Sequence, residues 1–249
     1  MRSPGSGDWP RGSPGGWAIA AFALLALPVW LGVALTPRPA CAWRLLHHAA
    51  RLWLTLAGIR LEVIDQSRPD TADAKLLVAN HASYLDGLVL IAALPAPGWR
   101  FVAKRELTGS FWSRIFLQRL GCLFVERFDL QQGLADAGRL AEAAQRGDRL
   151  AMFPEGTFTR APGLRPFHLG AFVTAAGAGL ALQPVALAGT RDRLRDGHWL
   201  PRRGTVRVTL GPTLDPGPLP GSEWERALAL RDAARAAILA GCGEPDLQR

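Results

Sequence analysis

The chain has 249 residues, a hydrophobic fraction of 49% and a formal net charge of +8. This length holds one α/β domain with a full hydrophobic core, and the composition is that of a globular protein. Most of the 29 basic residues are arginine, which binds phosphate bidentately, so anionic lipids, phosphorylated substrates and nucleic acids are the candidate partners. The arginines are scattered and form no nucleic-acid-binding motif, which disfavours nucleic acid.

The first 58 residues predict a membrane-associated segment. Residues 1–16 are rich in Pro, Gly and Ser, and we expect them to be disordered. Residues 17–35 carry no charge, and a helix of that length measures roughly 28 Å, close to the hydrocarbon thickness of a bilayer. We therefore expect a membrane anchor, although Pro28 leaves a bent or re-entrant segment open. A cleaved signal peptide is the alternative, and the anchor is favoured because the apolar stretch is long for a signal peptide.

The residues that follow the anchor are basic and amphipathic. More arginines lie after the apolar stretch than before it, so the positive-inside rule places the bulk of the protein in the cytoplasm. Residues 43–57 place leucines at helical spacing. This segment predicts a helix that either lies on the bilayer surface or packs its apolar stripe on the domain, and both alternatives stay open.

Residues 59–249 predict a single α/β domain. Strand-like and helix-like runs alternate from residue 60 onward, which indicates a mostly parallel central sheet flanked by helices. The expected strands are 61–64, 75–79, 100–103, 122–126, 150–153, 182–187 and 205–210, and the expected helices are 84–94, 109–120, 131–146, 168–178 and 223–240. Ser222 and Glu225 form a capping box that predicts the start of the last helix.

The chain has three cysteines, Cys41, Cys122 and Cys242, and they lie far apart. The odd number and the absence of a C-x-x-C pair argue against a disulfide framework or a zinc site, and we expect no metal. Cys122 lies inside an apolar strand-like run and is expected to be an inert core thiol.

Two polar clusters, each after an apolar run, predict one active site. The first is NHASYLD (80–86), and the second is FPEGT (153–157). His81 and Asp86 can meet if His81 lies on a loop and Asp86 in the first turn of the next helix, with Ser83 as N-cap and Asp86 at the third helical position. Asp86 then either caps the helix or orients His81. A His oriented by an Asp is a general base.

The sequence offers no protein nucleophile for this base. There is no G-x-S-x-G elbow, and Cys122 is expected to be buried. We therefore expect the base to activate a hydroxyl of the substrate, which predicts direct acyl transfer without a covalent enzyme intermediate.

These residues resemble the glycerolipid acyltransferases, in particular the bacterial 1-acylglycerol-3-phosphate acyltransferases. The resemblance covers about residues 60–215 and rests on four blocks in order: NHASYLD (80–86), GCLFVER (121–127), FPEGT (153–157) and QPVAL (183–187). It implies that an acyl group passes from acyl-CoA or acyl-carrier protein to the free hydroxyl of lysophosphatidic acid, with no cofactor. It also implies an enzyme of phospholipid biosynthesis at the inner membrane, with its catalytic domain on the cytoplasmic side.

The resemblance also implies roles for individual residues. His81 would deprotonate the hydroxyl and Asp86 would orient His81. The residues expected to bind the substrate are Lys104, Arg127, Glu155, Gly156, Thr157 and Arg160.

The chain departs from the family pattern where the family often reads Glu-Gly-Thr-Arg-Ser. Phe158 replaces the Arg, and Arg160 lies two residues later. Two alternatives therefore stay open: an acyltransferase for another lysolipid, such as a lysophospholipid or a lyso-ornithine lipid, and a non-catalytic lipid-binding protein of the same fold.

Overall fold

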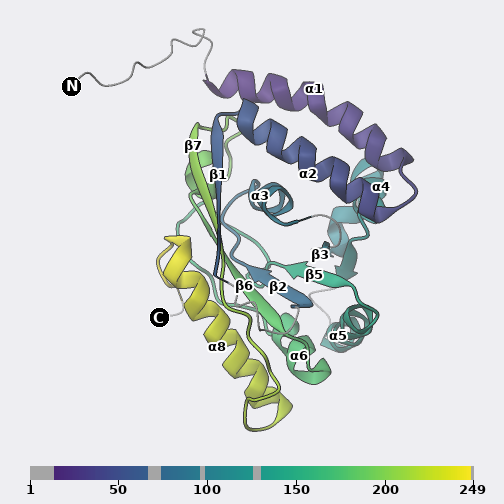
Figure 1. Ribbon diagram of the computed structural model, residues 1–249, viewed down its shortest axis with the longest axis vertical. Coiled ribbons are helices and arrows are strands. Elements are labelled where there is room, and N and C mark those ends of the chain that lie inside the picture. The colour runs from purple at the N-terminus through teal and green to yellow at the C-terminus, as the bar shows by residue number, and fades with distance from the viewer. Residues whose placement is uncertain (1–13, 67–73, 96–98, 126–129, 248–249) are drawn as a thin grey trace, which may run out of the picture.

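A computed structural model describes residues 14–66, 74–95, 99–125 and 130–247. Within these residues the chain forms a seven-stranded sheet of order β1-β7-β6-β2-β5-β3-β4, with helices on both faces (Figure 1). Neighbouring strands are parallel except for the antiparallel pair β6 and β7. The strands are β1 (Ile59–Asp65), β2 (Leu76–Ala79), β3 (Trp99–Lys104), β4 (Leu123–Val125), β5 (Arg149–Met152), β6 (Leu182–Ala188) and β7 (Gly204–Leu210).

The described helices form two layers. The helices are α1 (Pro14–Leu35), α2 (Pro39–Leu56), α3 (Asp86–Ala93), the 3₁₀ turn η1 (Arg105–Thr108), α4 (Phe111–Arg119), α5 (Leu130–Gln145), α6 (Gly170–Ala178), α7 (Thr190–Arg193) and α8 (Glu223–Cys242). One core lies under α1, α2 and α3, and a second lies under α5, α6 and α8. Figure 1 shows α8 and α6 on the side of the sheet away from α1 and α2.

The central strand β2 explains why both faces are covered. Its four residues are all buried, and successive side chains of a strand point to opposite faces. Leu77 and Ala79 enter the core under α1–α3, whereas Leu76 and Val78 enter the core under α5, α6 and α8. A continuous apolar run is typical of a parallel strand that is buried on both sides.

The register of the sheet brings two distant loops together. In the parallel pair β2 and β5, Val78 lies opposite Met152. Both strands therefore end at the same edge, and residues 80–86 and 153–157 leave the sheet side by side. The strand β1 runs in the opposite direction to β2, and its last residue, Asp65, lies level with Ala79 through the pairs Ala79–Val185, Val185–Leu210 and Leu210–Asp65.

The helices α1 and α2 form an antiparallel pair. Trp53 on α2 donates its indole N–H to the carbonyl of Ala18 near the start of α1, and Gly32 near the end of α1 lies against Leu45. The segment Gly16–Leu35 of α1 is long and apolar enough to cross a membrane. Its exposed large side chains are all apolar: Trp17, Ile19, Phe22, Leu24, Leu27, Leu31 and Leu35.

The helix α2 combines the two alternatives that its sequence left open. One side packs on the domain and buries Ala42, Trp43, Leu46, Ala50, Trp53 and Leu54. Another side exposes Leu45, Leu52 and Leu56, at i, i+7 and i+11. The helix is therefore both a core element and a carrier of exposed leucines.

The expected fold class is confirmed, and the expected elements agree with the observed ones to within a few residues. The capping box is present, because the Ser222 hydroxyl accepts the N–H of Glu225 and the Glu225 carboxylate accepts the N–H of Ser222. The expected helix 109–120 is observed as α4 (Phe111–Arg119), and the turn η1 (Arg105–Thr108) before it is an element that the sequence did not predict. The expected disorder of residues 1–16 falls almost entirely outside the described residues.

Candidate active site

The imidazole of His81 and the carboxylate of Asp86 meet at the end of β2. His81 Nδ1 lies 2.8 Å from Asp86 Oδ2, and the Asp86 side chain is fully buried. An ionised carboxylate accepts hydrogen bonds and cannot donate them. Nδ1 of His81 therefore carries the proton, and Nε2 carries the free lone pair. The His81 side chain is 19% exposed, which leaves this base within reach of a substrate.

Asp86 holds the loop as well as the imidazole. Its Oδ2 also accepts the backbone N–H groups of Ala82 at 2.6 Å and Ser83 at 2.7 Å. The recorded helix begins two residues later than expected, with Leu85 as N-cap and Asp86 as the first helical residue. The reciprocal bonds of the expected capping box are nevertheless present, because Asp86 accepts the N–H of Ser83 and the Ser83 hydroxyl accepts the N–H of Leu85.

Ser83 ties the loop to another segment. Its hydroxyl donates to the carbonyl of Leu194 and accepts the N–H of Leu85. Its neighbour Asn80, 1% exposed, bridges the end of β2 to β6, because its amide donates to the carbonyl of Leu187 and accepts the Leu187 N–H. These bonds fix the backbone on both sides of His81.

Aromatic rings pack around the His81 imidazole. Phe153 stacks on it at 4.3 Å between ring centroids, and Phe158 meets it edge-on at 4.6 Å. Phe158 also packs against Tyr84, whose hydroxyl donates to Asp196 at 3.1 Å. The imidazole is thus held by Asp86 in its plane and by aromatic contacts on its faces.

Glu155 braces the two clusters against each other. It is 3% exposed, and its two carboxylate oxygens accept the backbone N–H of His81 at 2.6 Å and of Arg165 at 2.9 Å. The pKa of Glu155 is raised to about 7, chiefly by burial. The charge of Asp86 adds to this rise, whereas the two N–H groups oppose it. Its carboxylate is therefore engaged by backbone groups, whereas the sequence predicted contact with a substrate.

The other residues expected at the site lie on two described segments, the end of β3 and the residues that follow Glu155. Gly156 adopts a left-handed backbone with φ of +72°, which glycine reaches without steric cost, and Thr157 is half-buried beside it. Arg160 is exposed and donates its Nε–H to the carbonyl of Asp196 at 3.4 Å. Lys104 ends β3 and is half-buried. Arg127 lies outside the described residues.

The segment 159–165, which follows the second cluster, is fastened by residues near the C-terminus. Arg191 forms an ion pair with Glu244 at 2.7 Å and donates to the carbonyl of Thr159 at 2.6 Å. Glu244 accepts the N–H of Gly163 with its other oxygen. Arg235, 4% exposed, donates to the carbonyls of Leu164 and Arg165 and to Asp246. These contacts hold the backbone that carries Arg160.

Sequence reasoning missed several contributors to this site. Phe153 was assigned no role beyond its motif, and neither Asp196 nor Glu244 was singled out. Asp196 and Glu244 lie more than a hundred residues from His81 in the chain and belong to no recognisable motif. Only the fold brings them into the hydrogen-bond network of the site. A weak signal existed for Asn80, which directly precedes His81 at a strand end.

The expected inert thiol is confirmed. Cys122 is 7% exposed, and burial raises the pKa of its thiol to about 12. All three cysteines are free. Within the described part of the chain, no three His, Cys, Asp or Glu side chains form a group that could hold a metal ion.

Comparison with known proteins gives consistent matches. A family model described as Acyltransferase matches residues 60–188. The chain is 34% identical over 181 residues to the lyso-ornithine lipid O-acyltransferase of Pseudomonas aeruginosa, covering 66% of this chain and 67% of that protein. It is 28% identical over 162 residues to a probable 1-acyl-sn-glycerol-3-phosphate acyltransferase of Mycoplasma pneumoniae, covering 63% of this chain and 59% of the relative's length.

A solved structure supports the fold. The crystal structure of the 1-acyl-sn-glycerophosphate acyltransferase from Thermotoga maritima superimposes with a TM-score of 0.67 and covers 91% of this chain and 95% of its own. The two sequences are 19% identical, so this likeness concerns the arrangement of the backbone.

The raised pKa of Glu155 predicts a pH dependence of stability. The ordinary value is 4.5 and the folded value about 7, so the folded state binds the proton more tightly and the free energy of unfolding falls as pH rises between these values. The difference corresponds to about 3 kcal/mol. Urea unfolding across this range should show the fall in the wild type and lose it in Glu155→Gln. The exposed Glu142→Gln is the control, and an equal fall in Glu155→Gln would contradict the assignment.

The fastening of segment 159–165 predicts a local effect of Glu244→Gln. This change removes the charge that Arg191 pairs with and should destabilise the protein by about 2 kcal/mol. Trypsin should cleave after Arg160 faster in this variant than in the wild type. Glu142→Gln again serves as control, and cleavage at the wild-type rate would show that Glu244 does not secure the segment.

Proposed function

Because the chain belongs to the acyltransferase family, we propose that it transfers a fatty acyl group from a thioester to the free hydroxyl of 1-acylglycerol-3-phosphate and so produces phosphatidic acid. The observation that supports this most is the contact of 2.8 Å between His81 Nδ1 and Asp86, which leaves Nε2 as a base at the edge of the sheet. The donor is acyl-CoA or acyl-carrier protein.

The reaction follows from the position of the proton on His81. Nε2 removes the proton of the acceptor hydroxyl, and the oxygen attacks the carbonyl carbon of the thioester. The C–S bond then breaks, the ester bond remains, and the thiolate leaves with the proton from the imidazolium. Asp86 stabilises the imidazolium between these steps through its bond to Nδ1. No residue of the protein is acylated.

Three sets of residues assist the base in this proposal. Arg127 and Lys104 bind the acceptor phosphate, and Arg160 adds positive charge from the neighbouring segment. Gly156 and Thr157 contact the glycerol backbone of the acceptor, and the glycine lets this ligand approach the main chain of the protein. Glu155 contributes by holding the His81 backbone in place.

The pair α1–α2 attaches the domain to the membrane. The two helices run antiparallel and in contact, and α2 packs on the domain while exposing Arg44, His48 and Arg51. A perpendicular crossing of α1 would draw these polar residues of α2 into the hydrocarbon, at a cost of several kcal/mol. We propose that α1 lies along one leaflet of the inner membrane, with the catalytic edge on its cytoplasmic side.

A second acceptor is favoured by one observation at the site. Phe158 and Tyr84 present aromatic rings beside His81, and Asp196 places a carboxylate next to them. Aromatic faces and a carboxylate attract a cation, whereas Arg160 attracts an anion. A zwitterionic lysolipid that carries an amine and a carboxylate, such as lyso-ornithine lipid, fits this combination. The Pseudomonas relative is named for that substrate.

Replacement of His81 tests the mechanism. His81→Ala removes the base, and kcat for transfer to 1-acylglycerol-3-phosphate should fall by about 10²-fold or more. The activity is measured in neutral detergent with purified protein, and circular dichroism checks that the variant is folded. His48→Ala, an exposed histidine of α2, should keep wild-type activity. A folded His81→Ala protein with unchanged kcat would rule out general-base catalysis by this residue.

An acceptor panel separates the two candidate substrates. We expect a higher kcat/KM for 1-acylglycerol-3-phosphate than for lyso-ornithine lipid, and the reverse order would favour the second candidate. Asp196→Asn removes the carboxylate that would hold an amine. It should lower transfer to lyso-ornithine lipid and leave transfer to 1-acylglycerol-3-phosphate unchanged, so an equal loss with both acceptors would show that Asp196 does not discriminate between them.

A further inference from the structure

A cavity of about 440 Å³ lies between the end of α2 and the start of β1. Its lining consists of Arg51, Leu54, Thr55, Gly58, Ile59, Arg60 and Leu61. This volume is in the range of small-molecule sites. The cavity shares no residue with the loops that carry His81 and Glu155, so it is distinct from the candidate active site.

We propose that this cavity binds the phosphate-bearing headgroup of an anionic phospholipid and thereby orients the catalytic edge of the sheet against the bilayer. The inference rests on the membrane association in the proposed function. It adds a lipid that is bound without being acylated.

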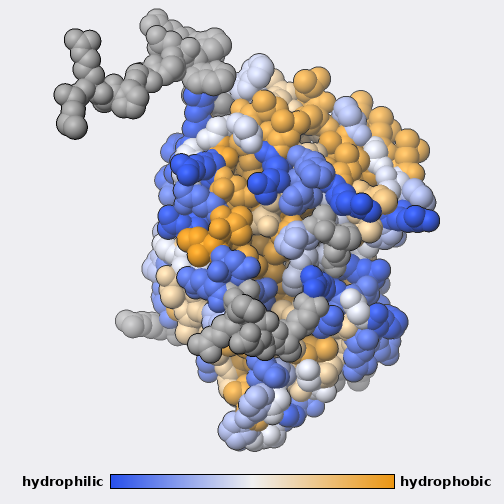
Figure 2. Space-filling view, in the orientation of Figure 1, coloured by the Kyte–Doolittle hydropathy of each residue, from blue (hydrophilic) through white to orange (hydrophobic). Residues whose placement is uncertain are grey.

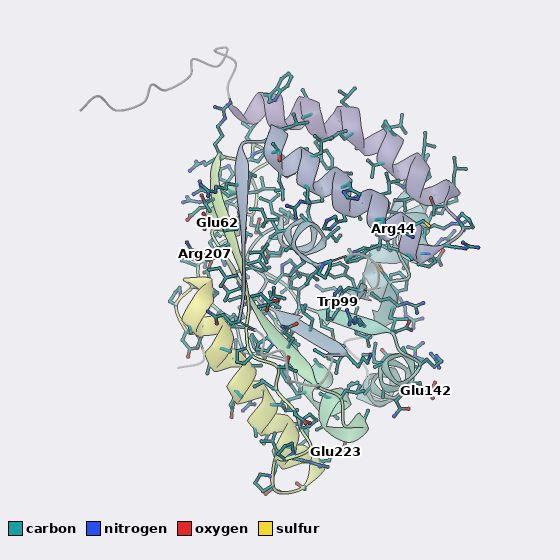
Figure 3. The ribbon with its side chains drawn as sticks, viewed as in Figure 1. Arg44, Glu62, Trp99, Glu142, Arg207 and Glu223 are labelled. Carbon is teal, nitrogen blue, oxygen red and sulfur yellow. The ribbon has the colours of Figure 1, made fainter. Side chains whose placement is uncertain are left out.

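Two arginines provide the charge that a phosphate requires. Arg51 is held in position because it donates to the carbonyl of Ala92 at 3.1 Å with one of its terminal nitrogens, Nη1. The guanidinium carries five N–H donors in a fixed fork, so donors remain for a ligand. Arg60 is 79% exposed and lies 3.5 Å from Glu62, a carboxylate that also pairs with Arg207 at 3.2 Å. Figure 3 labels Glu62 and Arg207 side by side on β1 and β7.

The surface beside the cavity suits a lipid rather than a soluble anion. Leu52 and Leu56 are exposed on α2, directly beside Arg51 and Thr55 in sequence. The polar residues Arg44, His48, Arg51 and Thr55 recur at i, i+4, i+7 and i+11 and so form one row along the helix. Figure 2 shows hydrophobic surface over α1 with hydrophilic surface below it, over α2. This row lies at headgroup level when the leucines enter the acyl region.

The position of the cavity means that a bound headgroup would orient the sheet relative to the membrane. The cavity residues Ile59 and Arg60 begin β1 on the side of the sheet toward which β2 ends, six residues beyond Asp65, which lies level with Ala79 at the end of β2. A headgroup held there turns that side of the sheet toward the membrane, where an amphiphilic acceptor resides.

Vesicle binding of the full chain tests the proposal. The wild type should bind phosphatidylcholine vesicles that contain phosphatidylglycerol more tightly than vesicles of phosphatidylcholine alone. Arg51→Gln and Arg60→Gln should each weaken binding to the anionic vesicles about fivefold, the contribution of one arginine near a charged surface. Binding to pure phosphatidylcholine should stay the same.

A matched control separates the cavity from diffuse charge. Arg44→Gln removes the same charge from the same row of α2, outside the cavity lining, and should weaken anionic binding less than Arg51→Gln does. Figure 3 places Arg44 at the far end of α2 from β1. Equal losses for Arg44→Gln and Arg51→Gln would overturn the proposal, as would a wild type that does not distinguish the two vesicles.

Two further arms complete the experiment. Inorganic phosphate, compared with chloride at equal ionic strength, should not displace the protein from anionic vesicles, and displacement would assign the cavity to a soluble anion. Acyl transfer in neutral detergent should be the same for Arg51→Gln and the wild type. If the wild type transfers acyl groups but binds vesicles equally well with and without phosphatidylglycerol, the lipid site is wrong and the proposed function stands. A wild type without acyl transfer activity overturns the proposed function itself.

Discussion

The carboxylate of Asp86 is the interaction on which the candidate active site depends. One oxygen accepts the N–H groups of Ala82 and Ser83 and faces His81 Nδ1. A buried carboxylate is costly unless hydrogen bonds compensate it, so these donors allow the charge to exist at a fully buried side chain. The same bonds fix the loop and the tautomer of His81. The loop conformation and the tautomer of His81 therefore have a common cause.

A second buried carboxylate makes this arrangement sensitive to charge. Glu155 accepts the His81 N–H, and both its burial and the charge of Asp86 raise its pKa to about 7. Near neutral pH, the carboxyl group that accepts the His81 N–H is therefore partly protonated. Glu155 links the two strand ends through backbone bonds, so its protonation bears on the geometry of the loop more directly than on the reacting atoms.

The sequence predicted the parts of this structure that local patterns encode. Apolar runs and their alternation predicted the sheet, and the approach of His81 to Asp86 followed from a strand end and a helix start. The bonds of the predicted capping box between Ser83 and Asp86 are present, but the regular helix begins two residues later than predicted. The bracing role of Glu155 and the contact of Tyr84 with Asp196 depend on segments that only the folded sheet brings together.

The helix α2 connects its exposed leucines to the base through packing. It exposes a row of leucines, and on its buried side Trp43 stacks on Phe101 at 5.8 Å. Phe101 in turn lies 6.3 Å from Phe153, which stacks on His81. Stacked rings in a close-packed interior shift together or leave voids, and a void costs stability. The orientation of the imidazole is therefore secured both by the carboxylate in its plane and by an aromatic column that rests on α2.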